Sequence, residues 1–94
     1  MSSFKHMDAM IALLSEIYEL NERIMTGDII SAKAAIKSPR MAKMLAHYRE
    51  SLTRDGATAI FLDAYPAAGG WVGLTYSYTL DGVEIAGSQT PRRV

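Results

Sequence analysis

The sequence predicts an α+β domain in which three N-terminal helices pack, in two layers, on a C-terminal three-stranded antiparallel meander. In residues 4–55, Ala, Met, Leu, Glu and Lys dominate, and apolar residues recur at the three- and four-residue spacing of amphipathic helices. In residues 57–87, Gly, Thr, Tyr and Val take over, as in strands. The 94 residues, 49% hydrophobic and 21% charged, suit one soluble domain. Residues 88–94 lack periodicity and are expected to form a loose tail.

The first helix is expected at residues 4–25, and its apolar surface is unusually wide. Two adjacent stripes run along it: Phe4, Met7, Ile11, Leu14, Tyr18 and Met25, and beside them Met10, Leu13, Ile17, Leu20 and Ile24. Only Asn21 interrupts the first stripe. A small monomer has few elements to cover so wide a face. We therefore predict a homodimer whose interface contains Met10, Ile17, Leu20 and Ile24. The alternative is that both stripes are buried within one chain.

Two more helices are expected before the sheet. Asp28 is a typical N-cap and predicts a short helix at 29–36. Ser38 followed by Pro39 is a second start signal, because serine caps the first amides and proline suits the first helical position. The third helix therefore spans 39–54. Its inward-facing side chains are Met41, Met44, Leu45, Tyr48 and Leu52.

The first two strands of the meander are separated by a loop rich in small residues. A strand is expected at 58–65, although its apolar residues alternate poorly. Residues 66–70 form the expected turn, and the strand at 71–80 alternates cleanly.

The last two strands are joined by Asp81-Gly82, which predicts a two-residue hairpin. A type I′ turn needs positive φ at both central residues, and Asp-Gly tolerates it. The last strand is expected at 83–87. This loop pairs Leu80 with Val83 and Tyr78 with Ile85.

No motif of an enzyme or a metal site is present. The absence of cysteine excludes disulfides, iron–sulfur clusters and thiol catalysis, and neither histidine has further ligands at metal-binding spacing. His47, Ser51 and Asp55 have the residue types of a catalytic triad, but four-residue spacing is typical of any polar helix face. We therefore expect a non-enzymatic protein without a metal or cofactor.

Charge and hydropathy predict a cytoplasmic protein that does not enter membranes. Ten basic and ten acidic residues give a formal net charge of zero. No run of 18 apolar residues exists, and the N-terminus does not have the pattern of a secretion signal.

A basic stripe on the third expected helix makes DNA binding the alternative function. Residues 37–56 hold five basic and two acidic side chains, a net charge of +3. The stripe consists of Lys37, Arg40, Lys43, His47 and Arg54. The order of helices and strands resembles a winged helix-turn-helix. Two features argue against it: the loop at 66–70 has no cation, and Glu50 and Asp55 dilute the basic face.

Protein recognition is the favoured function. Strand alternation places Trp71 on the face opposite the core, next to a loop of small residues, where an exposed tryptophan is a typical anchor. The predicted partner site contains Trp71, Pro66, Gly69 and Gly70. The alternative is that Trp71 folds back over the sheet edge. Small, cysteine-free chains without catalytic motifs are common among bacterial and phage regulators and inhibitors, so we expect such a role and origin.

Overall fold

A computed structural model describes residues 5–94, with side chains from Met7 onward, so the expected helix start at Phe4 lies outside the described part. Helices are followed by strands, which confirms the α+β class. The elements are α1 Lys5–Met25, α2 Ala32–Ile36, α3 Pro39–Arg54, β1 Thr58–Ala67, β2 Trp71–Leu80 and β3 Val83–Gln89. The strands form one antiparallel sheet in the order β1-β2-β3.

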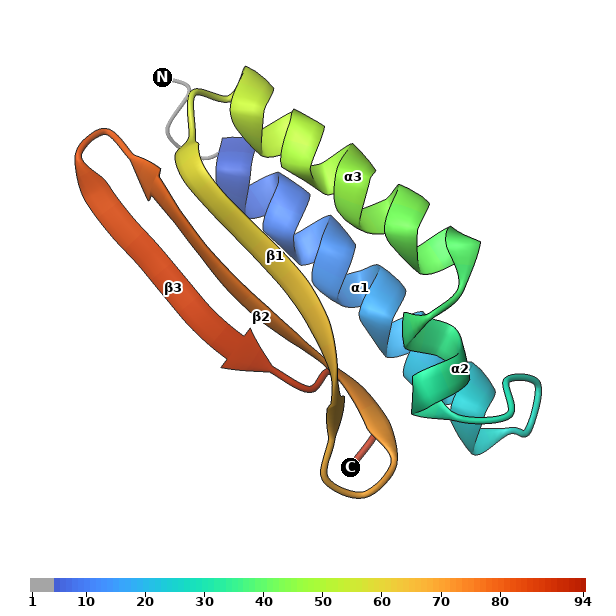
Figure 1. Cartoon of the computed structure of the whole chain (residues 1–94). Coiled ribbons are helices and arrows are strands. Elements are labelled where there is room, and N and C mark those ends of the chain that lie inside the picture. Colours follow the sequence, from blue (N-terminus) through green and yellow to red (C-terminus); the bar gives the residue numbers. More distant parts are fainter. Residues whose placement is uncertain (1–4) are drawn as a thin grey trace.

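The helices pack against one side of this sheet, and they leave β3 uncovered. α3 lies along β1, α1 lies along β2, and the two helices run beside each other (Figure 1). Within the described residues no helix comes close to β3. The centre of the core is formed by Leu13, Ile17, Met41, Leu52, Val72 and Leu74.

The predicted dimer interface belongs to this core. Met10, Ile17 and Leu20 are 6%, 0% and 3% exposed in the single chain, and Ile24 is half-buried against the same core. Met10, Ile17 and Leu20 are nearly inaccessible because α1 is packed on two sides at once, by α3 and by β2. These three residues have little surface left for a second copy, whereas Ile24 keeps part of its surface exposed. The apolar residues that α1 does expose belong to the other stripe: Met7, Ile11, Tyr18 and Met25.

The second helix starts later than expected. α2 begins at Ala32 because the Ser31 hydroxyl, and not Asp28, caps it and accepts a hydrogen bond from Ala34 N at 3.1 Å. The start of α3 is confirmed: Ser38 Oγ accepts from Met41 N at 3.2 Å, and Pro39 opens the helix.

A bulge explains why the first strand alternates poorly. Thr58 pairs with Thr79 but Phe61 pairs with Ser77, so β1 holds one extra residue between them. Ala59 takes a positive φ of 52° there. Inward and outward positions therefore exchange along β1, which a strict two-residue period cannot describe.

Both hairpins are tight. The pairs Leu80–Val83 and Tyr78–Ile85 are confirmed, with φ of 52° at Asp81 and 78° at Gly82 as a type I′ turn requires. The first loop is shorter than predicted.

That first loop contains only residues 68–70, because β1 continues through Pro66 and Ala67. Proline is tolerated in β1 because this strand lies at the edge of the sheet.

The C-terminal segment makes specific contacts with the rest of the fold, whereas the sequence predicted a loose tail at residues 88–94. β3 extends to Gln89, and the following residues turn back across the start of β2 towards α1 (Figure 1). The absence of periodicity in 88–94 was a poor guide because the contacts of this segment involve backbone and charged groups, which leave no hydrophobic pattern.

Candidate functional site

The first hairpin and the C-terminal segment meet at one end of the molecule and form a surface around Trp71. The Trp71 ring is half-buried, and the guanidinium carbon of Arg92 lies 5.7 Å from the ring centroid, within the range of a cation–π contact. Gly69 lies against the ring edge: a Cβ there would come within 3.0 Å of Trp71 Cδ1 and Nε1. We call Gly69, Gly70, Trp71 and Arg92 the hairpin-end surface.

The four predicted partner-binding residues lie at this same end, but not on one face. Ala67 is opposite Trp71 and Pro66 is opposite the buried Val72. Since side chains alternate along a strand, Pro66 and Trp71 project to different faces of the hairpin. Gly69 and Gly70 are exposed in the loop, with φ of 89° and 88°. Arg92 was not predicted, because nothing in the sequence placed the tail beside Trp71.

Asn21 holds this end together. It is 1% exposed, and its Oδ1 accepts a hydrogen bond from Val72 N at 2.8 Å. Its Nδ2 donates to Val72 O at 3.0 Å and to Pro91 O at 2.7 Å. The side-chain amide of Asn21 thus connects the start of β2 to the C-terminal segment, and both of its N–H donors and one of the two acceptor positions of its oxygen are used.

The register explains why an amide is needed there. Leu74 pairs with Gln89, so two more residues of ladder would set Val72 opposite Pro91. Proline has no N–H to donate, and the ladder would fail at this pair. Asn21 supplies the missing donor and acceptor. The only sign of this role in the sequence is that Asn21 is a polar residue within the apolar stripe of the first helix.

An ion pair adds a further attachment of the tail. Arg93 Nη2 lies 2.8 Å from Glu22 Oε2, one residue after Asn21 on α1. The other oxygen, Glu22 Oε1, is buried and has no hydrogen-bond partner within the described residues. Three consecutive tail residues, Pro91, Arg92 and Arg93, therefore contact two elements of the fold, α1 and β2.

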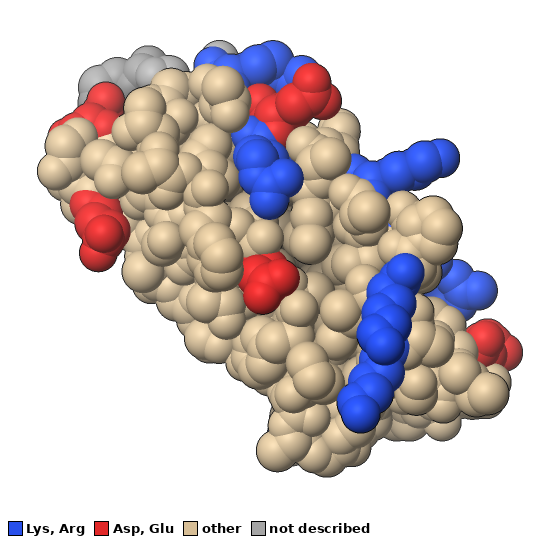
Figure 2. Space-filling model, viewed as in Figure 1, with Lys and Arg blue, Asp and Glu red and all other residues tan. Residues whose placement is uncertain are grey.

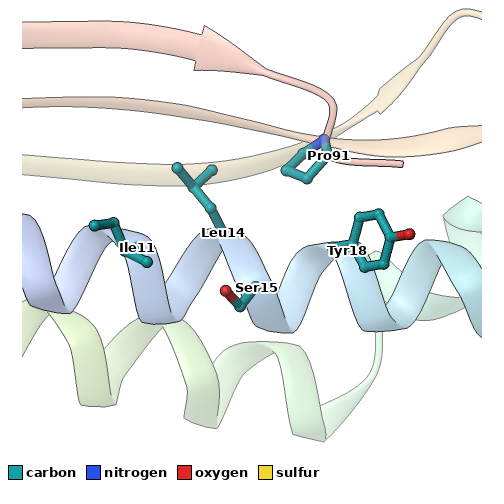
Figure 3. A pocket seen from close by; sticks show the side chains of 5 residues that line it. All are labelled: Ile11, Leu14, Ser15, Tyr18 and Pro91. Carbon is teal, nitrogen blue, oxygen red and sulfur yellow. The ribbon is translucent and has the colours of Figure 1, made fainter. Parts of the chain in front are cut away.

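A second surface lies between α1 and β3. It is a groove of about 380 Å³ lined by Met7, Met10, Ile11, Leu14, Tyr76, Tyr78, Ile85 and Gln89. It continues along α1 into a hollow of about 320 Å³ lined by Ile11, Leu14, Ser15, Tyr18 and Pro91. Figure 3 shows Leu14 directed from α1 towards the sheet, and Ile11, Ser15 and Tyr18 along the open side of the helix below Pro91. We call these two connected hollows the α1–β3 groove.

The predicted basic residues do not form a continuous cationic surface. Arg40, Lys43, His47 and Arg54 are exposed on α3, and Lys37 caps the end of α2. Arg40 Nη2 lies 3.7 Å from Glu19 Oε1. Figure 2 shows basic side chains separated by acidic and uncharged residues on the face in view.

The arrangement shows no catalytic constellation among the described side chains. Ser51 Oγ donates to the backbone carbonyl of His47 at 3.2 Å, which is a bond along the helix and not a contact with the imidazole. The His47 ring packs edge-on against Tyr48, with centroids 4.9 Å apart. In the part of the chain where side chains are described, no three His, Cys, Asp or Glu residues cluster as metal ligands, and no helix is long and apolar enough to cross a membrane.

Two phenols, that of the half-buried Tyr48 and that of the buried Tyr78, have shifted pKa values for structural reasons. Desolvation, together with the hydrogen bond and negative charge of Glu16, raises the pKa of Tyr48 to about 12. Burial, followed by the charge of Tyr76, raises the pKa of Tyr78. Both shifts keep the phenols neutral, and neither prepares a reactive group.

The Tyr48 shift predicts a loss of stability in alkali. The unfolded chain releases this phenolic proton near pH 10.0, whereas the folded chain holds it until about pH 12. Stability from this group is therefore complete below pH 10.0 and falls as the pH rises towards 12. We expect thermal melts of Tyr48→Phe to show a shallower decline over this window than the wild type. The control Tyr18→Phe, at an exposed tyrosine, should decline like the wild type. Equal slopes for the wild type and Tyr48→Phe would refute the assignment.

Fold and surfaces together define a small α+β protein with two exposed surfaces, the hairpin-end surface and the α1–β3 groove. Comparison with known proteins adds no relative: no family model matches the chain, and no curated protein or solved structure matches it.

Proposed function

We propose that this chain is a small non-enzymatic regulatory or inhibitor protein of the bacterial or phage cytoplasm, and that it binds a protein partner through the hairpin-end surface. The observation that carries the proposal is the pairing of Trp71 with Arg92. Tryptophan and arginine are the residue types most enriched among those that dominate binding energy at interfaces. Here they stack at the tip of a hairpin, where the ring is still half-exposed.

The surroundings of this pair indicate the chemistry of the partner. Arg92 forms no ion pair within the described residues, whereas its neighbour Arg93 is bound to Glu22. Gly69 and Gly70 have no side chains, so a partner can approach the backbone beside the ring. The complementary surface is therefore an apolar side chain beside a carboxylate: the first packs on the indole, and the second pairs with the guanidinium.

Substitution at the hairpin end should abolish partner capture without unfolding the protein. In pull-downs from a bacterial lysate, Trp71→Ala and Arg92→Glu should each lose a partner that the wild type retains, and Trp71→Ala should weaken binding by about 2 kcal/mol or more. The partner should survive nuclease treatment. Phe61→Ala is the matched control, because Phe61 is a half-exposed aromatic residue near the other end of β1. Retention of the partner by both hairpin-end variants would refute the proposal.

DNA binding through α3 is the second candidate. It is favoured by the exposure of Lys43 and Arg54, neither of which forms an ion pair within the described residues. If α3 binds duplex DNA, Arg40→Ala with Lys43→Ala should abolish gel retardation, and wild-type affinity should fall steeply with salt. The absence of any retardation at about 50 mM salt, where even non-specific binders hold, would eliminate this function.

A further inference from the structure

The outer edge of β3 carries main-chain N–H and C=O groups that form no hydrogen bonds with another described strand. β3 is the last strand of the sheet and pairs only with β2. In a hairpin closed by two residues, the flanking pair Leu80–Val83 exchanges both hydrogen bonds, and hydrogen-bonded pairs then recur at every second residue. The intervening residues Glu84, Ala86 and Ser88 therefore direct their N–H and C=O groups outward.

The two edges of the sheet differ in how well they are protected. β1 has a bulge at Ala59 and a proline at position 66, both of which discourage another strand from pairing. β3 has the sequence VEIAGSQ, with no proline and no Lys or Arg, and its register to β2 is regular. The edge at β3 is therefore the one that accepts a further strand.

The helix-facing side of β3 is also incomplete. The α1–β3 groove exposes apolar side chains on both of its walls: Ile11 is 59% exposed on α1, and Ile85 is only half-buried on β3. A strand added beside β3 would extend the sheet beneath this groove, and a helix carried with that strand would cover it. A single partner that has an edge strand with an apolar helix beside it would therefore cover both the open edge of β3 and the α1–β3 groove.

We propose that this partner is a second copy of the same chain, joined by antiparallel pairing of β3 with β3 around a two-fold axis through Ala86. This register pairs Ala86 with Ala86 and Glu84 with Ser88, so that all three outward-facing residues of each strand are used and no like charges meet. An axis through Glu84 would instead set two carboxylates opposite each other, which is unfavourable. The formal net charge of zero removes any general repulsion between copies.

The same symmetry brings the exposed stripes of the two α1 helices towards each other. In the six-stranded sheet, the two β2 strands lie three spacings apart, roughly 14 Å at the usual interstrand distance. Packed helices are about 8–10 Å apart, so the gap between the α1 helices is a few ångströms wider. Met7, Ile11 and Tyr18 of both copies are long enough to fill it. The interface does not involve the hairpin-end surface, so the dimer proposal is independent of the proposed function.

Single cysteines test the register, since the chain has no cysteine of its own. With the axis at Ala86, the two copies of Ala86→Cys have Cα atoms about 5.5 Å apart, which suits a disulfide. The matched control is Glu84→Cys, an exposed residue of the same strand and face, whose two copies lie roughly 13 Å apart. We expect Ala86→Cys to oxidise rapidly to a covalent dimer and Glu84→Cys to remain reduced. Equal rates of crosslinking would overturn the proposal.

Sedimentation of the untagged chain tests the interface itself. The wild type should be dimeric at micromolar concentration. Ala86→Pro removes an outward N–H that the β2–β3 ladder does not use, and Ile11→Glu charges the groove; both should sediment as monomers with an unchanged circular dichroism spectrum. The control Phe61→Glu alters an exposed residue of β1 and should remain dimeric. A wild type that stays monomeric up to millimolar concentration, or a dimer that survives both substitutions, would overturn the proposal.

Discussion

Replacing Asn21 by leucine is expected to lower the free energy of unfolding by about 3 kcal/mol or more, since two buried groups and one partly buried group lose their partner at once and each loss of a buried group's partner costs about 1–3 kcal/mol. Leucine has the same branched arrangement of side-chain heavy atoms and suits the helix, so the shape at this position is kept while its hydrogen bonds are removed. The substitution leaves Val72 N–H, Val72 O and Pro91 O without the hydrogen bonds that they form with the Asn21 amide. Urea denaturation measures the loss.

A control on the same helix separates this effect from the general consequences of adding leucine. Glu19 is exposed, and its one ion pair among the described side chains, with Arg40, is long at 3.7 Å. Glu19→Leu should change stability by less than about 0.5 kcal/mol, as most exposed substitutions do. If Asn21→Leu were as mild as Glu19→Leu, the amide would not be the connection between α1, β2 and the tail that we describe.

Ile17→Ala is expected to lower the free energy of unfolding by about 2–5 kcal/mol, the usual range for removing a buried isoleucine side chain beyond Cβ. Ile17 is 0% exposed in the single chain, so its contacts are lost whether or not the chain associates. Thermal melts at several protein concentrations provide the measurement. The destabilisation should be independent of concentration, because the side chain packs inside one copy.

The matched control for Ile17 lies on the exposed stripe. Ile11→Ala removes the same atoms from the same helix, but at a position that is 59% exposed. Its effect on unfolding of the monomer should stay within about 0.5 kcal/mol. If instead Ile17→Ala left the monomer stable and disrupted only a dimer, the result would support the sequence-based prediction that Ile17 lies in the dimer interface.

Most of the secondary structure was predictable because each element carries local signals. Ser38-Pro39 marked the start of α3, and Asp81-Gly82 established both the loop and the register of β2 with β3. Ser31 and Asp28 are both good capping residues, and local sequence does not say which of them caps; this is why the start of α2 was misplaced by three residues. The bulge at Ala59 left only poor alternation as its trace.

The surfaces were less predictable because they depend on contacts between distant segments. Two adjacent apolar stripes on α1 were visible, but which of them faces the core depends on where β2 and α3 lie, and the stripe assigned to the interface is the one that is mostly buried in the single chain. Arg92 and Pro91 are brought to Trp71 and Asn21 by the course of the tail after β3. No periodicity encodes that course. The role of Asn21 becomes clear only from its hydrogen bonds to Val72 and Pro91.

The most direct test of the proposed function uses Trp71 as a reporter, since it is the only tryptophan in the chain. The protein is labelled with 5-fluorotryptophan and titrated with the protein partner that the pull-down retains after nuclease treatment. The single ¹⁹F resonance is followed. We expect this resonance to shift on binding and to become less accessible to solvent, because the partner buries the exposed part of the ring. A saturated complex in which the chemical shift and solvent accessibility of Trp71 are unchanged would contradict the proposal that the hairpin end binds the partner.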